Sequence, residues 1–416
     1  MRRRSSEVLP NPSLVNASNT KKIVYATHFT VFLYATCYWI QIGVMPYLTR
    51  KLGANTTMFG YLQSVFAFVQ LCGGPFFGRF GDLFGGKYAL LLAAFSSVST
   101  YGLMSIASSV PLLFLSRLVS VAMHTLQGSQ MVITSITTDE ERAAGIGRLG
   151  ISYGIGMVVG PLLGGFLTDK FSEQAAAFAA MIGSAAMVVV VFIFVPKHFK
   201  ECTEKSRKKS VSNDSVFDMK KYISIFQLPN FTYLFVIKTI SSFPIGVFQA
   251  MFSVFTMDYF HLSAKENGIV LSYVGITGMI VQGLCTDFLT RRFSESMLIK
   301  YSVAVLAASN FLLIFVTNIY AFVIVLVPLI TSGSVFTVII TSLVTKSVSS
   351  QDTGAALGLS MASNSFIRTV TPMIGGVLYS LFGFPLFGLL GLFVNGLLTF
   401  YLFFYGRNSF VNEEKN

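Results

Sequence analysis

The chain has 416 residues, of which 53% are hydrophobic and only 12% carry a charge, a balance typical of a protein embedded in a lipid bilayer. A formal net charge of +12 would suggest nucleic acid as the partner of a soluble protein, but these basic residues are distributed as in a membrane protein, which argues against that class. The four cysteines have no disulfide or metal-ligand spacing, and no nucleophile–base constellation, phosphate loop or cofactor motif indicates an enzyme.

Apolar segments of roughly 20 residues, each long enough to cross about 30 Å of hydrocarbon, recur along the whole chain. Because lipid offers the backbone no hydrogen-bond partners, such segments must be helical. The predicted spans are residues 23–47, 58–79, 88–108, 111–135, 145–168, 175–196, 231–256, 267–288, 296–316, 319–345, 355–380 and 384–405. The sequence therefore predicts an all-α membrane protein with twelve transmembrane helices.

The longest interruption, residues 197–230, is rich in Lys and Arg and divides the spans six and six. If the spans alternate from a cytosolic N-terminus, 23 of the 30 Lys and Arg lie on the cytosolic side, 4 outside and 3 within the membrane, which agrees with the positive-inside rule. The predicted organisation is a cytosolic tail over 1–22, a six-helix bundle over 23–196, a basic cytosolic linker over 197–230, a second six-helix bundle over 231–405 and a cytosolic tail over 406–416, placed in the plasma membrane or an endomembrane.

A glycine-rich segment with Gly78, Asp82, Gly85 and Lys87 joins the second and third spans. Its glycines allow two helix ends to approach closely. Asp82 is expected either to cap the following helix or to pair with a cation that is released when the two bundles move apart. A simple tight turn would use the same residue types.

The fifth span contains Gly156, Gly160, Pro161, Gly164 and Gly165. Proline removes a backbone donor and kinks the helix, while the glycines permit close packing. We expect Gly160 and Pro161 to matter more for a transport cycle than for membrane insertion, although a purely structural interface of small residues would show the same pattern.

Both motifs return in the second half of the chain, and internal repeats of this kind are found in many transporters. The returning residues are Gly283 and Asp287, 205 positions after Gly78 and Asp82, and Pro372, Gly375 and Gly376, 211 positions after Pro161, Gly164 and Gly165.

Polar side chains inside apolar helices are costly and usually face a cavity or a partner. Four spans carry such residues at helical spacing, so that each set shares one face. The sets are Tyr34, Tyr38 and Gln41; Arg117, Ser120, His124 and Gln127; Lys238, Ser242 and Gln249; and Ser360, Asn364 and Arg368.

Each charged member of these sets has an alternative interpretation. Arg117 and Lys238 could extend outward to the membrane interface, and His124 could be a hydrogen-bonded core residue or a group that exchanges protons. Arg368 lies too deep to reach the interface easily. Because none of the 18 Asp and Glu falls in the middle of a span, local electrostatics favour an anionic, zwitterionic or neutral solute.

The segment from Gly78 to Lys87 resembles the signature G-x-x-x-D-R-x-G-R-K of the major facilitator superfamily, with Leu83 and Gly86 in place of two basic residues. The pattern G-x-x-x-G-P-x-x-G-G of the fifth span resembles that of the twelve-span drug:proton antiporters. Runs such as Pro46 to Gly53 and Gly60 to Gln63 resemble the organic-cation-transporter-like solute carriers.

The resemblance implies a major facilitator fold, in which two six-helix bundles surround a midplane site where the four polar stripes converge. It also implies secondary transport by alternating access, coupled to protons and moving small organic ions or drugs, with organic cations as the substrate class. The cation class conflicts with the lack of intramembrane acids, and both signs of substrate remain open at this point. A membrane sensor or scaffold without net flux is the alternative from another functional class.

Overall fold

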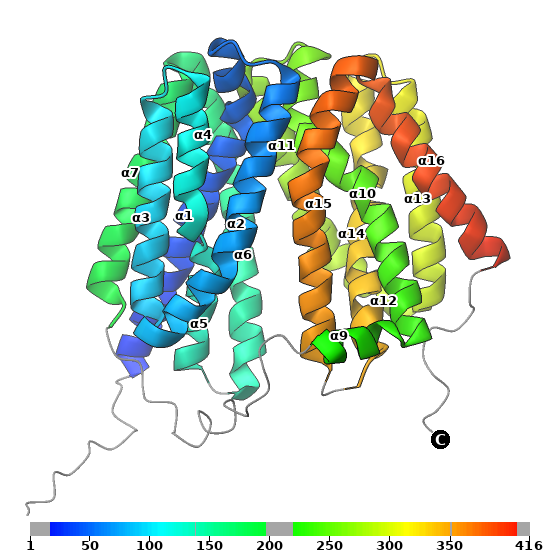
Figure 1. Cartoon of the computed structure of the whole chain (residues 1–416), viewed down its shortest axis with the longest axis horizontal. Coiled ribbons are helices and arrows are strands. Elements are labelled where there is room, and N and C mark those ends of the chain that lie inside the picture. The colour runs from blue at the N-terminus through cyan, green and yellow to red at the C-terminus, as the bar shows by residue number, and fades with distance from the viewer. Residues whose placement is uncertain (1–16, 138, 197–218, 350–351, 406–416) are drawn as a thin grey trace, which may run out of the picture.

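The computed structural model describes residues 17–137, 139–196, 219–349 and 352–405, and within these ranges every regular element is helical. The first half forms one bundle of helices and the second half another, and the two lie side by side in Figure 1. We call the side on which α1, α6 and α15 begin the lower side, and the side on which α2 and α11 begin the upper side. All twelve predicted spans are confirmed as helical segments.

The N-terminal bundle follows the predicted spans closely. Its elements are α1 (Ala17–Lys51), α2 (Thr56–Phe84), α3 (Gly86–Ser105), α4 (Val110–Val119), the 3₁₀ turn η2 (Ser120–Ala122), α5 (Thr125–Ile136), α6 (Asp139–Lys170) and α7 (Glu173–Phe194). The predicted tail over 1–22 is too long, because α1 already begins at Ala17.

The fourth span is predicted as one helix and is instead broken at residues 120–124. The break lies against α2, where a Cβ atom added to Gly73 would be 1.9 Å from the carbonyl oxygen of Val121. Only a residue without a side chain permits this approach of one backbone to another. The sequence gives no local warning, since neither proline nor glycine occurs within 120–124.

The C-terminal bundle contains one element that the spans do not predict. Its elements are α9 (Met219–Phe226), α10 (Pro229–Asp258), α11 (Ala264–Ile280), the π turn η3 (Val281–Cys285), α12 (Thr286–Arg292), α13 (Glu295–Ile314), α14 (Ile319–Lys346), α15 (Thr353–Phe382) and α16 (Pro385–Phe404). The short helix α9 falls within the linker predicted over 197–230, whose residues 197–218 lie outside the described ranges.

Local side chains fix where several helices start on the upper side. The Asn55 side chain accepts a hydrogen bond from the Met58 amide, and Ser263 forms a capping box with Glu266. These contacts satisfy amides that have no partner within the helix. The starts of α2 and α11 are therefore determined locally and stand at matching positions in the two halves, 208 residues apart.

Among the described residues, ten helical segments have the length and hydropathy to cross a membrane, and α2 and α15 do not reach that hydropathy. These two helices pack against each other between the bundles.

Candidate functional site

A cavity of about 700 Å³ lies between the two bundles. Helices of both bundles line it, from Phe59 near the upper side to Gln282 and Val338 toward the lower side. Its polar and aromatic lining includes Tyr38, Trp39, Gln63, Phe66, Tyr153, Phe248, Gln249, Gln282, Asn310, Thr337 and Arg368. Its place between the bundles matches the position of the midplane site that the resemblance implies.

Three predicted site residues line the cavity, namely Tyr38, Gln249 and Arg368. The Arg368 guanidinium donates a hydrogen bond of 3.3 Å to the Tyr38 hydroxyl, which joins α15 of one bundle to α1 of the other. None of the described residues that line the cavity is Asp or Glu, and Arg368 is the single Lys or Arg among them. The cavity therefore carries a positive charge with no carboxylate beside it.

Aromatic rings of the N-terminal bundle gather around Tyr38, the hydrogen-bond partner of this guanidinium. The Tyr38 ring lies 6.1 Å from that of Trp39, 6.3 Å from that of Phe66 and 6.0 Å from that of Tyr34. Tyr153 is a further lining residue. The polar stripes in the sequence do not include the lining residues Trp39, Phe66 and Tyr153, although the single tryptophan of the chain is a usable signal.

Arg117 lies behind this lining rather than in it. Its side chain is fully buried, and one terminal nitrogen is 2.8 Å from the Met45 sulfur. The guanidinium carbon lies 5.1 Å from the centre of the Phe66 ring, and Phe66 is a lining residue. Arg117 is therefore not among the described residues that line the cavity in this conformation. Because its side chain is fully buried within its own bundle, it does not extend to the membrane interface.

Lys238 is placed in the same way inside the C-terminal bundle. It is 3% exposed and its ammonium donates to the Ser360 hydroxyl, so that α10 and α15 are joined within one bundle. It neither lines the cavity nor extends to the membrane interface. Ser242 is half-buried and Asn364 is exposed, and neither is a lining residue.

The remaining predicted residues of the first bundle also lie outside the lining. Tyr34 and Gln41 are buried on α1. The His124 ring packs on Phe77 of α2, with 5.3 Å between the ring centres. A Cβ atom on Gly78 would lie 3.3 Å from the side-chain nitrogen Nε2 of Gln127. His124 and Gln127 therefore contact α2 near the break in the fourth span.

The segment from Gly78 to Lys87 has a role within the first bundle. The Lys87 ammonium donates a hydrogen bond of 2.8 Å to the Phe192 carbonyl. Gly85 has φ of 89° and precedes α3, a backbone conformation that favours glycine. The expectation that Asp82 caps α3 is wrong, since Gly85 is the N-cap residue and Asp82 is exposed.

The second copy of this segment differs from the first. Asp287 forms an ion pair of 2.9 Å with Arg291 on the same helix, and both side chains are exposed. Gly283 lies in the π turn, and a Cβ atom there would meet no atom within 4 Å.

The glycines of the fifth span serve two different contacts. Gly156, Gly160 and Gly164 face α1 of the same bundle, where Cβ atoms would come within 2.6, 2.6 and 3.1 Å of α1 atoms. Gly165 faces the other bundle, since its Cβ atom would lie 2.5 Å from the Ala264 carbonyl oxygen of α11. The contact of Gly160 therefore lies inside one bundle, and its expected role in the transport cycle stays a prediction.

We expect Gly160→Leu to lower the yield of folded protein, because the new side chain would separate α1 from α6. Gly150→Leu is the matched control, since a Cβ atom at Gly150 on the same helix meets nothing within 4 Å. Monodisperse yield in size-exclusion chromatography measures the difference. A normal yield of Gly160→Leu combined with lost transport would support its predicted role in cycling.

Two matching contacts close the bundles against each other on the upper side. A Cβ atom on Gly60 of α2 would lie 2.4 Å from the Pro372 carbonyl oxygen of α15, and one on Gly268 of α11 would lie 2.3 Å from the Pro161 carbonyl oxygen of α6. Gly376 and Gly165 lie one turn further along α15 and α6, each close to the same partner helix. The repeated glycine–proline motif thus builds two equivalent contacts.

Polar contacts reinforce this closure. Arg50 of α1 forms an ion pair of 2.6 Å with Asp258 of α10, and the Tyr47 hydroxyl donates to the Leu262 and Ser263 carbonyls at 2.9 and 3.1 Å. The hydrogen bonds and the ion pair that join the two bundles among the described residues lie in the upper half or near the middle. The described conformation is therefore closed on the upper side.

Comparisons with known proteins agree with this architecture. The family profile of the Major Facilitator Superfamily matches residues 27–339. The chain is 39% identical to mouse Solute carrier family 22 member 18, covering 91% of this chain and 95% of the relative. It is 36% identical to human Solute carrier family 67 member A1, covering 94% of each. Multidrug resistance protein 1 of Bacillus subtilis is 28% identical, covering 82% of this chain and 86% of the relative.

Solved structures show the same fold at low identity. The nucleoside transporter NupG superposes with a TM-score of 0.69 at 15% identity, covering 92% of this chain and 98% of that chain. The human organic anion transporter MFSD10 superposes with a TM-score of 0.59 at 16% identity, covering 92% and 99%. The chain is a multi-pass integral membrane protein that belongs to the Major Facilitator Superfamily, a family of transporters and not of enzymes.

Proposed function

We propose that the chain is a secondary transporter that moves a small amphipathic organic solute with an anionic or zwitterionic head by alternating access. The observation that carries this proposal is the position of Arg368 in the central cavity, with no carboxylate among the described lining residues. A guanidinium recognises carboxylate and phosphate groups through paired hydrogen bonds. The aromatic rings of Tyr38, Trp39 and Phe66 would hold the apolar part of the solute.

An organic cation is the second candidate, and the same rings favour it. The faces of Tyr38, Trp39 and Phe66 could attract a cation through their quadrupoles. A desolvated contact of this kind is worth about 2 kcal/mol, whereas repulsion by an unneutralised guanidinium in a cavity of low dielectric opposes it over a longer range. We therefore favour the anionic or zwitterionic head.

Flux in proteoliposomes tests the proposal. The purified chain is reconstituted, and uptake of an aromatic carboxylate is compared with uptake of a quaternary ammonium built on the same ring system. We expect saturable uptake of the carboxylate. Saturable uptake of the ammonium alone would support the organic-cation alternative, and binding without flux of either compound would support a sensor or scaffold.

We further propose that transport is a proton-coupled antiport. His124 supports this proposal, because it lies at the break of the fourth span and imidazole ordinarily titrates near pH 6.5. An imposed pH gradient should drive accumulation in proteoliposomes, and His124→Gln should reduce that accumulation while solute exchange without a gradient continues. Uptake that ignores the gradient in the unmodified protein would contradict proton coupling.

The charge bias supports a cytosolic lower side, with both termini and residues 197–230 facing the cytosol. Cys202 lies outside the described residues, in the basic linker, and reports on this orientation. In a variant whose other cysteines are replaced by serine and which is placed in the plasma membrane, we expect Cys202 to resist an impermeant maleimide until the cells are permeabilised. Labelling of Cys202 in intact cells would show that the lower side faces the outside, opposite to the proposed orientation.

A further inference from the structure

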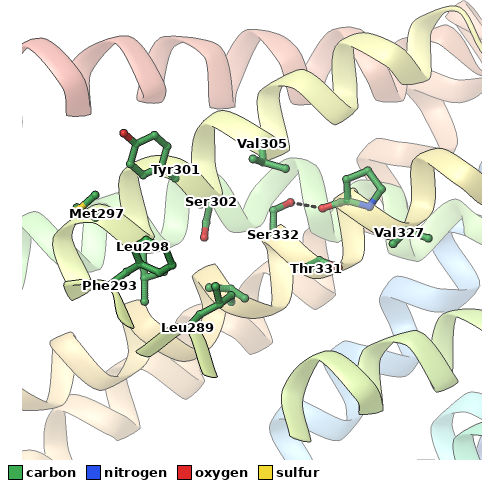
Figure 2. A pocket seen from close by; sticks show the side chains of 12 residues that line it. Leu289, Phe293, Met297, Leu298, Tyr301, Ser302, Val305, Val327, Thr331 and Ser332 are labelled. Carbon is green, nitrogen blue, oxygen red and sulfur yellow. Dashed lines mark hydrogen bonds between the residues drawn. The ribbon is translucent and has the colours of Figure 1, made fainter. Parts of the chain in front are cut away.

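A second cavity of about 600 Å³ lies on the C-terminal bundle, between α12, α13 and α14. Figure 2 shows Leu289 and Phe293 at one end of this groove, with Tyr301 and Val305 along α13. Tyr301 and Val305 are 55% and 42% exposed. Because these helices belong to a membrane-spanning bundle, the groove opens to lipid.

The π turn η3 directly precedes α12, the helix whose residue Leu289 lines the groove. Residues 281–285 form one wide turn in which the Thr286 hydroxyl bonds to the carbonyl of Val281, five residues earlier. A π turn inserts an extra residue and displaces the helix that follows it. The corresponding helix of the first half, α2, continues without such a turn to Phe84. The repeat is therefore broken at this point.

Most residues that line the groove are apolar, and one of its polar residues is hydrogen-bonded within its own helix. The Ser332 hydroxyl donates a hydrogen bond of 2.6 Å to the carbonyl of Pro328 on its own helix, as the dashed line in Figure 2 shows. From Met297 to Val305 the wall extends over about 12 Å at 1.5 Å per residue. This surface suits a hydrocarbon chain and offers little to a polar solute.

A basic residue adjoins two lining residues of the groove on α12. Arg292 lies between Leu289 and Phe293 in the sequence, and these two residues line the groove whereas Arg292 itself does not. Its guanidinium lies over the Phe288 ring, 5.0 Å from the ring centre, and among the described residues it forms no ion pair. The neighbouring Arg291 is already paired with Asp287. Arg292 is exposed at the end of a candidate membrane span and is therefore available to an anionic group.

We propose that this groove binds one acyl chain of an anionic phospholipid whose headgroup contacts Arg292. Hydrophobicity alone does not select an occupant, because the surrounding lipid is equally apolar. Selection comes from charge: a basic residue near an anionic membrane surface contributes roughly 1 kcal/mol, which corresponds to about a fivefold preference over a zwitterionic lipid. The site is distinct from the transport cavity, which has Leu306 and Gly333 on its own wall of α13 and α14.

Native mass spectrometry of the purified full chain with equal amounts of phosphatidylglycerol and phosphatidylcholine tests this site. We expect one phosphatidylglycerol adduct retained about fivefold over phosphatidylcholine. Arg292→Gln should reduce the ratio to near one. Val305→Trp should fill the groove and remove the adduct, whereas Val189→Trp, on an exposed face of α7, should retain it.

An adduct that survives Val305→Trp, or a ratio unchanged in Arg292→Gln, would overturn the proposal. A phosphatidylglycerol with a photoreactive acyl chain keeps the test independent of whether the tryptophan variant folds. In the unmodified protein we expect crosslinks to α13 and α14, and crosslinks spread evenly over both bundles would also overturn the proposal. None of these results depends on transport, so they leave the proposed function untouched.

Discussion

Arg368→Gln should reduce kcat/KM for an anionic or zwitterionic substrate by about 10- to 100-fold. This range corresponds to the loss of a charge-assisted hydrogen bond of roughly 1.5–3 kcal/mol. No other Lys or Arg among the described lining residues can take over its charge. The measurement is initial uptake into proteoliposomes over a range of substrate concentrations.

Arg368→Lys is the matched control for charge. It keeps the positive charge and removes the planar guanidinium, which binds a carboxylate through two parallel hydrogen bonds. We therefore expect a loss of kcat/KM for a carboxylate substrate that is smaller than the loss in Arg368→Gln. Lys238→Gln is a second control, because that ammonium lies outside the cavity and bonds to Ser360. Robust electrogenic uptake of a simple quaternary ammonium, unchanged or improved by Arg368→Gln, would reject the anion hypothesis and favour the cation.

Gly268→Ala should reduce transport at least tenfold while the yield of folded protein stays near normal. The added methyl group would lie 2.3 Å from the Pro161 carbonyl oxygen, so the upper sides of the two bundles could not close as they do in this conformation. The contact lies between the bundles, and each bundle therefore keeps its own packing. A carrier that cannot close one side cannot complete alternating access.

Gly275→Ala provides the control on the same helix and toward the same partner. A methyl group there would meet Met157 and Val158 at 3.4 Å, an ordinary contact distance. Labelling of a cysteine introduced at the cavity residue Ile245, with an impermeant reagent applied from the upper side, reports on closure. We expect faster labelling in the Gly268→Ala background than in the Gly275→Ala background. Equal labelling in both would show that this glycine contact does not control access.

The sequence was sufficient for the fold because its signals are periodic and repeated. The length of the apolar segments predicts where the spans lie. The repeated glycine–proline motif predicts that the two halves of the chain have related structures. The cavity was predicted less completely. A polar stripe identifies one face of a helix but not the neighbour that this face meets, and this neighbour depends on rotation about the helix axis.

Arg368 and Lys238 illustrate this limit. Both are basic residues within apolar spans, yet Arg368 points between the bundles and Lys238 points inside one of them. The difference depends on how each helix is rotated toward its neighbours, and the partners of both side chains lie far away in the sequence. Tyr153 and Phe66 were missed for a related reason, because an aromatic residue in an apolar helix is no signal until a cavity is placed beside it.

The glycine–proline contacts of the upper closure have a consequence for ionic strength. They join backbone to backbone, with Gly60 against Pro372 and Gly268 against Pro161, and involve no charged group. The ion pair nearby is partly exposed, with the Arg50 side chain 59% accessible, and pairs of this kind contribute about 0–1 kcal/mol and weaken with salt. Closure on this side therefore rests mainly on close packing and uncharged hydrogen bonds, and the carrier should favour the closed conformation almost equally in dilute and concentrated salt.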